Sequence, residues 1–318
     1  MRRSNELEAV VMGRVGADLY PNQIGVPLSE VRTYTRYAGG FATNVATGLA
    51  RLDVSVAIVS KVGDEGHGEF IRNFLVSEGV DVRWLGTDPD NLTPIVFCEV
   101  VPPDHFPLLF YRRPTAPDWE LTIDDVDIEK AARAPLLFIS GTGLAREPSR
   151  QTTVTATLAH AGTVVFDLDW RPSVWDEPSK YPAIASVLID RADVVIGNEE
   201  ELCAALDVDD AERASGVLIE RGVKTVIMKR GGKGVVCFEG DDRIDVPPMA
   251  TEVKNGLGAG DAFAAVLGHG LLRKIPTEET LRRANAAGAI VASQLACSEA
   301  MPANDDITAF LQTEVREC

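Results

Sequence analysis

The sequence predicts an α/β protein in which a mostly parallel central sheet is covered by helices on both faces. Short apolar runs alternate with amphipathic stretches along most of the 318 residues, which is the rhythm of repeated β-α-β units. Many of these runs are apolar throughout, as expected for parallel strands that are buried on both faces. The length suits one large α/β domain with or without a small appendage.

The individual elements follow from this rhythm in chain order. Strands are predicted at the short apolar runs 8–12, 54–59, 136–140, 163–168, 194–197, 225–229 and 235–238. Helices are predicted where apolar residues recur at helical spacing, at 44–52, 67–77, 259–272 and 277–295. The last of these helices has Thr277 as a plausible N-cap and two acids in its first turn, where the helix dipole favours them.

Two segments, 13–38 and 94–113, interrupt the rhythm. The first is rich in Gly, Pro and Thr and lacks helical periodicity, and the second has two β-rich runs around the turn PPDHF. Parallel strands need helical crossovers, which these segments lack. We therefore predict that they pair as one small antiparallel flap on a single domain spanning 1–318; two separate hairpins on the main sheet are the alternative.

Composition narrows the range of partners. The 31 basic and 48 acidic residues give a net charge of −17, which disfavours binding to nucleic acid and to membranes. An anionic substrate would need local positive charge. No apolar run approaches the length of a membrane span, and the amino-terminal string MRRSNELEAVVMG lacks the apolar core of a secretory signal. We expect a cytoplasmic protein.

The five cysteines are scattered along the chain, odd in number and without a CxxC pair. This pattern predicts neither a disulfide framework nor a zinc site. We expect reduced, partly buried thiols.

The most specific chemical signal is the string NGLGAGDAF at 255–263. Its glycines let the backbone approach a ligand closely, and the free amides and dipole of the helix that follows favour phosphate oxygens. Asp261 lies in the same turn, where a carboxylate can accept a hydroxyl proton. A glycine-rich loop with an acid favoured only by the dipole is the alternative, but the whole string favours a catalytic site.

Other phosphate-binding motifs are missing. The pair Gly232-Lys233 is followed by Gly234 rather than Ser or Thr, so there is no P-loop, and no GxGxxG follows the first strand. The nucleotide site must therefore be built differently from those of P-loop and dinucleotide-binding proteins.

The string GAGDAF at 258–263, together with YAGGFATN at 37–44, resembles the two signatures of the ribokinase-like (PfkB) carbohydrate kinases. The resemblance covers essentially the whole chain with its elements in order. It implies a ribokinase-like three-layer α/β/α fold, a lid formed by about 13–38 and 94–113, and ATP-dependent phosphorylation of a sugar. It also implies the residues of the sugar site and catalytic centre: Gly258, Ala259 and Gly260 as an anion hole, Asp261 as base, and Asp18, Gly39, Gly40 and Asn44 as sugar contacts.

The same resemblance suggests a nucleotide site. In the string NEEE, Asn198 and Glu201 match residues that organise Mg²⁺ and phosphates through water; an N-capped helix with a solvated acidic turn is the alternative. The turn KRGGKG and a later helix supply the other implied ATP contacts, Lys229, Gly231, Gly234 and Asn285. A basic hairpin tip and an exposed helical Asn are the alternatives for these. Asn255 replaces an Asp that many members carry, which argues against activation by a monovalent cation.

Two arginines indicate an acidic substrate. Arg112 ends the string FYR of the flap, and Arg171 lies in DLDWRP after a core strand. Both strings resemble the sugar-acid branch of the family, where these arginines receive the substrate carboxylate with paired hydrogen bonds. The alternatives are a solvated flap residue for Arg112 and a salt bridge to Asp167 or Asp169 for Arg171.

Longer strings, including GRVGADLYPNQIGVPL and YRRPTAPD, resemble the enzymes that phosphorylate the 6-hydroxyl of 5-dehydro-2-deoxygluconate in myo-inositol breakdown. Phosphorylation of 2-dehydro-3-deoxygluconate is the nearest alternative, followed by a fructokinase or ribokinase activity. A catalytically silent sugar-binding regulator would be expected to lose Asp261 or the anion-hole glycines, and both are present. The exposed edge of the flap further suggests a homodimer through the lid.

Overall fold

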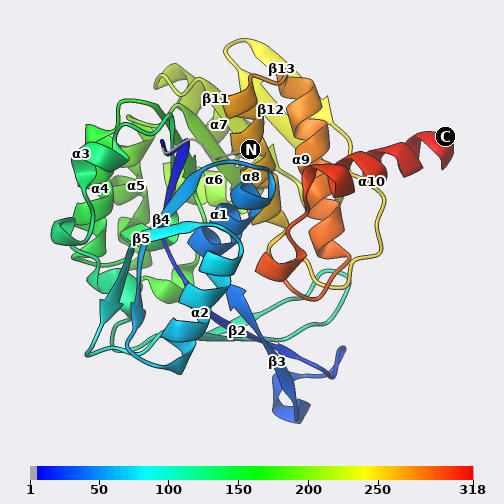
Figure 1. The fold of residues 1–318 in the computed structure, drawn as a ribbon. Coiled ribbons are helices and arrows are strands. Elements are labelled where there is room, and N and C mark those ends of the chain that lie inside the picture. Colours follow the sequence, from blue (N-terminus) through cyan, green and yellow to red (C-terminus); the bar gives the residue numbers. More distant parts are fainter. Residues whose placement is uncertain (1–5, 318) are drawn as a thin grey trace.

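The computed structural model describes residues 6–317. A large sheet lies at its centre, with a smaller sheet projecting from one edge (Figure 1). The large sheet has nine strands in the order β13-β12-β11-β10-β9-β8-β1-β4-β5. Its strands are β1 Ala9–Met12, β4 Val56–Gly63, β5 Asp81–Asp88, β8 Leu136–Ser140, β9 Thr163–Asp167, β10 Val194–Asn198, β11 Thr225–Lys229, β12 Val235–Glu239 and β13 Asp242–Val246.

The central strands form because their sequences bury apolar side chains on both faces. Every residue of β1 (AVVM) and of β8 (LLFIS) is buried. All pairings from β5 through β11 are parallel, as predicted. The strands β12 and β13 are antiparallel to their neighbours, because the short glycine turn at 230–234 returns the chain without a crossover.

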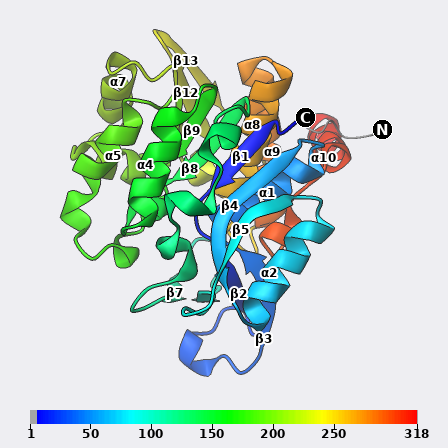
Figure 2. The same ribbon diagram turned by 60° about the vertical axis from the view of Figure 1, so that its left-hand side comes forward.

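Helices cover both faces of this sheet, which confirms the predicted three-layer architecture (Figure 2). One apolar core lies between the sheet and α1, α2, α8, α9 and α10, and the other lies between the sheet and α3 to α7. The helices are α1 Phe41–Arg51, α2 Gly66–Ser77, α3 Ile128–Ala131, α4 Ser149–Ala159, α5 Tyr181–Ile189, α6 Glu199–Leu206, α7 Ala211–Glu220, α8 Ala259–Arg273, α9 Thr277–Ala292 and α10 Asn304–Glu317.

The two segments that interrupt the β-α-β rhythm lie together in the small sheet. Its strands are β2 Gly16–Pro21, β3 Tyr34–Gly39, β6 Ile95–Cys98 and β7 Leu108–Tyr111, in the order β3-β2-β6-β7. The prediction of a wholly antiparallel flap was wrong at one place, because β2 and β6 pair in parallel. This is possible because the chain passes through α1, β4, α2 and β5 of the main domain between these two strands.

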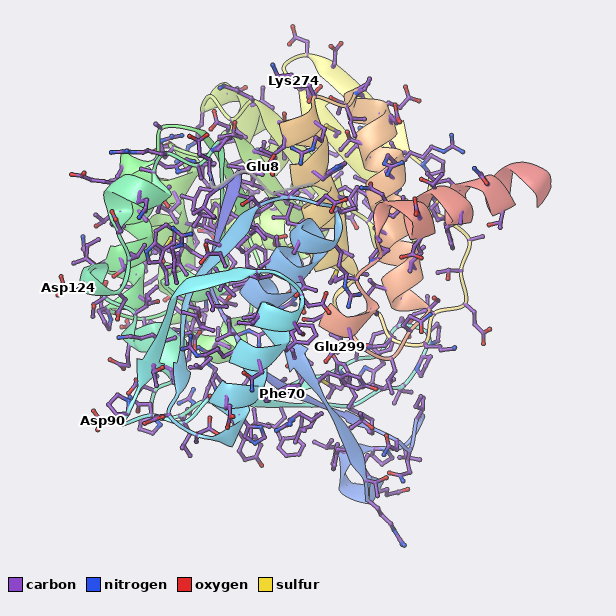
Figure 3. The ribbon with its side chains drawn as sticks, viewed as in Figure 1. Glu8, Phe70, Asp90, Asp124, Lys274 and Glu299 are labelled. Atoms are coloured by element: carbon purple, nitrogen blue, oxygen red, sulfur yellow. The ribbon has the colours of Figure 1, made fainter. Side chains whose placement is uncertain are left out.

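The small sheet is attached at its base to the carboxyl-terminal part of the chain. Glu299, labelled in Figure 3, accepts a hydrogen bond from the Ala38 amide of β3 at 3.0 Å. On the side facing the main domain, Tyr20 of β2 packs with Val96, Cys98 and Cys297. The sheet is thus held close to the segment that follows α9.

The lengths of the helices and the state of the cysteines bear on two predictions from the sequence. Within residues 6–317, no helix is long and apolar enough to cross a membrane. Four cysteines, Cys98, Cys203, Cys237 and Cys297, are free thiols, and all except Cys203 are buried. Residues 1–5 and Cys318 lie outside the part of the chain that the structure describes.

Candidate active site

Polar side chains form a row where the parallel strands end. Ser140, Asp167, Asn198 and Lys229 are the last residues of β8, β9, β10 and β11. The strand register pairs Ser140 with Asp167 and Asn198 with Lys229, so the row follows the carboxyl edge of the sheet. Ligands of open α/β sheets bind at this edge.

The glycine string starts α8 close to this row. Gly258 is the N-cap of the helix with φ of +80°, a left-handed conformation that favours glycine. A Cβ at this position would also lie 2.8 Å from Cys297 Sγ. The first helical amide with an intrahelical partner is that of Ala262, which donates to Gly258 O, so the amides of 259–261 are free to bind an anion.

Asp261 is held in place by a neighbouring helix. Asn44 of α1 donates from Nδ2 to Asp261 Oδ2 at 2.6 Å. The other end of the same amide, Oδ1, accepts from the hydroxyl of Ser298. Asn44, which the sequence suggested as a sugar contact, therefore orients the predicted base and leaves Asp261 Oδ1 available.

The surroundings of Asp261 raise its pKa to about 6. Burial is the main cause, because a buried carboxylate loses hydration, and the negative charge of Asp169 adds to it. The hydrogen bond from Asn44 and the charges of Lys229 and Arg14 act in the opposite direction. A carboxylate with this pKa is ionised at neutral pH and is more basic than an exposed one.

Lys229 neutralises part of the buried negative charge. Its Nζ lies 3.4 Å from Asp167 Oδ2, and only 3.2 Å from the point that a Cβ on Gly260 would occupy. Burial acts to lower the pKa of Lys229, but the nearby Asp167, Glu201 and Asp261 outweigh it and raise that pKa. A charged ammonium group thus lies beside the start of α8. A phosphate bound here would be stabilised by this charge and by the open amides of the helix.

Asn198 and Glu201 form a reciprocal cap on α6. Asn198 Oδ1 accepts from the Glu201 amide, and Glu201 Oε2 accepts from the Asn198 amide, both at 2.8 Å. This is the helix cap that the sequence left open as an alternative. However, Glu201 is buried rather than solvated, and its charge raises the pKa of Asp167. Among residues 6–317, no three acidic, His or Cys side chains converge as direct ligands of a metal, so a cation here would need phosphate or water oxygens.

The remaining predicted nucleotide residues lie along the same edge. Gly231 and Gly234 have φ of +53° and +85° in the turn between β11 and β12. Packing also explains the glycine at position 234, because a Cβ there would lie 2.2 Å from Val246 O. Asn285 of α9 donates to Pro247 O at 2.9 Å, which places this helix against the segment after β13.

On the small sheet, Asp18 occupies the space left by a glycine. A Cβ on Gly39 would lie 2.1 Å from Asp18 Oδ2, and a Cβ on Gly40 would lie 2.5 Å from Arg14 O. Burial raises the pKa of Asp18 to about 6, against the opposing charge of Arg14 and a hydrogen bond from Tyr20. Asp18 Oδ1 is buried and has no hydrogen-bond partner in the described residues, as expected for a group that awaits a ligand.

The two arginines of the predicted acid clamp differ in their surroundings. Arg112 is not a solvated flap residue: it is 4% exposed, donates from Nη2 to Asp118 Oδ2 at 2.8 Å, and stacks 3.6 Å above the Trp119 ring. Its Nε and Nη1 have no partner among the described residues. Arg171 pairs with Asp169 at 3.2 Å and its side chain is 44% exposed, so the salt bridge that was the alternative to the clamp is present.

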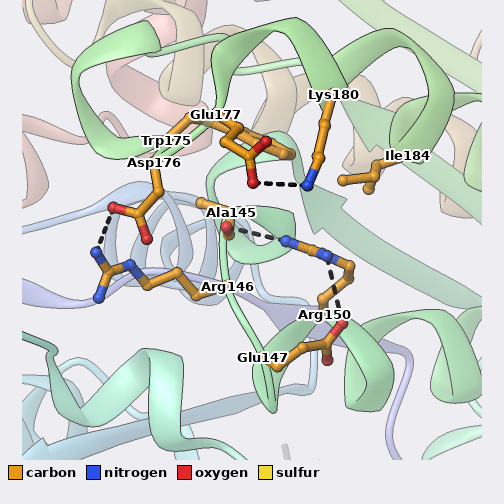
Figure 4. A pocket seen from close by; sticks show the side chains of 9 residues that line it. All are labelled: Ala145, Arg146, Glu147, Arg150, Trp175, Asp176, Glu177, Lys180 and Ile184. Atoms are coloured by element: carbon orange, nitrogen blue, oxygen red, sulfur yellow. Dashed lines mark hydrogen bonds and ion pairs between the residues drawn. The ribbon is translucent and has the colours of Figure 1, made fainter.

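A separate hollow is lined by residues that include Arg146, Arg150 and Lys180, and its charges are already paired (Figure 4). Arg146 pairs with Asp176, Lys180 with Glu177, and Arg150 with Glu147. Because each cation has a carboxylate partner, this hollow provides no strong site for an anion.

The sequence reading missed several residues around Asp261. Ser298 orients Asn44 through a hydrogen bond. Asp167 and Asp169 add negative charge near Asp261. Burial raises the pKa values of Asp18 and Asp261, and the charge of nearby Arg14 opposes this rise at both residues. For Arg14 the sequence did contain a signal, because it lies only four residues before Asp18 in the string GRVGAD. Ser298 became recognisable only from its hydrogen bond to Asn44.

Comparison with known proteins agrees with this geometry. The family model described as pfkB family carbohydrate kinase matches residues 7–304. The chain belongs to this family. A 5-dehydro-2-deoxygluconokinase of Geobacillus kaustophilus is 33% identical over 96% of this chain and 94% of its own, and one of Shouchella clausii is 32% identical over 98% of both.

Solved structures place this kinase in the same fold. A fructokinase of Vibrio cholerae, in a form with fructose, ADP and calcium bound, superposes with a TM-score of 0.86 and 26% identity over 96% of this kinase and 99% of that chain. A putative ribokinase II of E. coli in complex with ATP and Mg²⁺ gives 0.87 with 23% identity, over 96% and 99%. The ribokinase-like fold and carbohydrate kinase activity predicted from sequence are thereby confirmed.

Proposed function

We propose that this kinase transfers the γ-phosphoryl group of ATP to the 6-hydroxyl of 5-dehydro-2-deoxygluconate, a keto sugar acid of myo-inositol breakdown. The observation that carries the chemistry is the half-buried Asp261, fixed by Asn44 in the first turn of α8 beside unpaired amides. The choice of substrate is supported by relatives named 5-dehydro-2-deoxygluconokinase that match almost the full chain.

In the proposed reaction, Asp261 accepts the proton of the 6-hydroxyl as that oxygen forms a bond to the γ-phosphorus. The bond from the γ-phosphorus to the bridging oxygen breaks, and ADP leaves with its electron pair. The amides of Gly258, Ala259 and Gly260 would stabilise the developing negative charge. Asp18, Gly39, Gly40 and Asn44 would surround the sugar.

The nucleotide would lie along the carboxyl edge of the sheet. Lys229 supplies charge to the phosphates, and Gly231, Gly234 and Asn285 border the nucleoside. Magnesium fits a site made mostly of phosphate and water oxygens, with Asn198 and Glu201 orienting those waters. The ion would neutralise phosphate charge. Such a reaction needs ATP, and we propose that it takes place in the cytoplasm.

The substrate carboxylate would bind Arg112 and Arg171. Arg112 has two unpaired buried nitrogen atoms, and Arg171 would exchange its partner Asp169 for the ligand. Because Arg112 follows the lid strand β7, this contact would help close segments 13–38 and 94–113 over the sugar and exclude water.

A substrate panel tests the proposal. The purified kinase, with ATP and Mg²⁺, should have a higher kcat/KM for 5-dehydro-2-deoxygluconate than for 2-dehydro-3-deoxygluconate, fructose or ribose. A preference for one of the other three would replace the proposed substrate. Binding of the acid with no phosphorylation of any member would instead support a silent sugar-binding regulator.

The acid clamp has its own test. Arg171→Ala should lower kcat/KM for the acid by about ten- to a hundred-fold, the effect of losing a charge-assisted hydrogen bond. Arg112→Ala should be combined with Asp118→Asn, because the single change would leave Asp118 buried and unpaired. If both variants slow acid and neutral substrates equally, these arginines serve structure rather than recognition.

A further inference from the structure

Arg14 has buried nitrogen atoms without partners. It lies between β1 and β2, and its Nε and Nη1 are buried without a hydrogen-bond partner among the described residues. None of the ion pairs found within residues 6–317 includes it. Leaving a buried guanidinium unpaired is costly, so this arrangement suits a group that a ligand completes.

The backbone and the side chain of Arg14 are both fixed. Its carbonyl oxygen accepts from the Ala42 amide at the start of α1, at 3.1 Å. Its guanidinium carbon lies 5.3 Å from the centre of the Phe110 ring of β7. The side chain is therefore held between the main domain and the small sheet, near the carboxyl groups of Asp18 and Asp261.

Arg112 follows Phe110, the ring that Arg14 contacts, by two residues, and it also has buried nitrogen atoms without partners among the described residues. Its Nε and Nη1 are also buried and unpartnered, while Asp118 takes only Nη2. Burial lowers the pKa of Arg112, and the charge of Arg14 lowers it further despite Asp118. Two neighbouring cations with unpaired donors form a receptor for one anion, since a carboxylate can accept hydrogen bonds from both.

We propose that Arg14 is a specificity-determining residue that joins Arg112 and Arg171 in binding the substrate carboxylate. This rests on the proposed function only in requiring a sugar acid as substrate. Arg171 would have to release Asp169 to bind this group, and Arg146 pairs with Asp176 (Figure 4), whereas Arg14 has no ion-pair partner among the described residues. Arg14 thus brings a positive charge that has no ion-pair partner among the described residues to the sugar side of a strongly acidic protein.

The test compares the acid with its amide, which has the same skeleton but no charge. Calorimetry without ATP gives the Kd of each compound, and steady-state assays give kcat/KM. Arg14→Gln should weaken binding of the acid by about ten- to a hundred-fold and change binding of the amide much less. Arg14→Lys should restore part of the loss, because it supplies charge without the planar fork.

Arg83→Gln is the matched control, since Arg83 pairs with Asp81 on the outer strand β5 away from the site. It should leave both Kd values unchanged. Equal weakening of acid and amide in the Arg14 variants would overturn the proposal, as would a loss of ATP affinity alone, which would assign Arg14 to a phosphate. If Arg14→Gln does not fold, the ratio of acid to amide affinity in Arg14→Lys decides.

The wild-type protein separates the two proposals. If it prefers a different sugar acid, the proposed substrate is wrong, and the same comparison with that acid and its amide still decides the role of Arg14. If it binds no sugar acid more tightly than the neutral amide, the role of Arg14 is wrong as well.

Discussion

We expect Asp261 to act as the base, and two effects act on its carboxyl group in opposite senses. Burial makes the proton harder to lose, and Asn44 stabilises the charged form through Oδ2. The variant Asp261→Asn keeps the shape but cannot accept the proton, so kcat should fall by about 10² to 10⁴-fold. Nucleotide binding and the melting temperature should change little. A kcat within a few-fold of wild type would show that Asp261 is not the base.

Activity should also depend on pH through this residue. The raised pKa of about 6 means that Asp261 becomes protonated as the pH falls through that value, and a protonated carboxyl cannot accept the hydroxyl proton. The kcat/KM should therefore be high above pH 7 and fall about tenfold per pH unit well below 6. A profile that stays flat down to pH 4.5 would contradict this assignment.

At the level of elements, the contact between α1 and α8 positions Asn44 against Asp261. A Cβ on Gly48 of α1 would lie 2.6 Å from the Cβ of Ala265 in α8, so the helices touch because this residue has no side chain. Gly48→Ala should force them apart, lower the free energy of unfolding by about 1–3 kcal/mol and reduce kcat. Denaturant unfolding and steady-state kinetics measure the two effects.

Gly216 provides the matched control for that change. It lies exposed in α7, and a Cβ there would meet nothing within 4 Å. Gly216→Ala should raise the free energy of unfolding by about 0.4–1 kcal/mol, because alanine has less freedom to lose on folding. If both substitutions have the same effect, close packing of α1 on α8 is not what fixes the base.

At the scale of the whole molecule, the outer face of the small sheet bears on oligomeric state. The ring of Phe97 meets those of Tyr34 and Tyr111 edge-on, with centroids 5.3 and 5.2 Å apart. On the same sheet, Leu109 and Tyr111 are 47% and 60% exposed. We propose that this face pairs with a second copy, which would cover its apolar area.

Sedimentation velocity tests this pairing. The wild-type protein should sediment at twice the chain mass of 34.3 kDa. The double variant Leu109→Asp, Tyr111→Asp should sediment as a monomer, because it places charge in the interface. Leu158→Asp, at a 59% exposed site on α4, should remain dimeric. A lid-mediated dimer would be refuted if the wild-type protein were monomeric. It would also be refuted if the Leu158→Asp variant dissociated as the double variant does.

The sequence by itself determined the fold class, and it indicated the glycine-rich turn that we propose as catalytic. Largely apolar runs such as that of β8 are typical of strands in a sheet covered on both faces, and the glycines before Asp261 are typical of the start of a helix with open amides. These are local properties, so neighbouring residues in the chain suffice to reveal them.

Only the tertiary structure decided how distant residues meet. The parallel pairing of β2 with β6, the hydrogen bond from Asn44 to Asp261, and the contact of Arg14 with the Phe110 ring each join segments separated by many residues. A polar side chain takes its role from the partners it lacks or finds on folding. The sequence shows where an arginine is, but packing decides whether it pairs with a neighbouring carboxylate, as at Arg171, or keeps buried nitrogen atoms without partners among the described residues, as at Arg14.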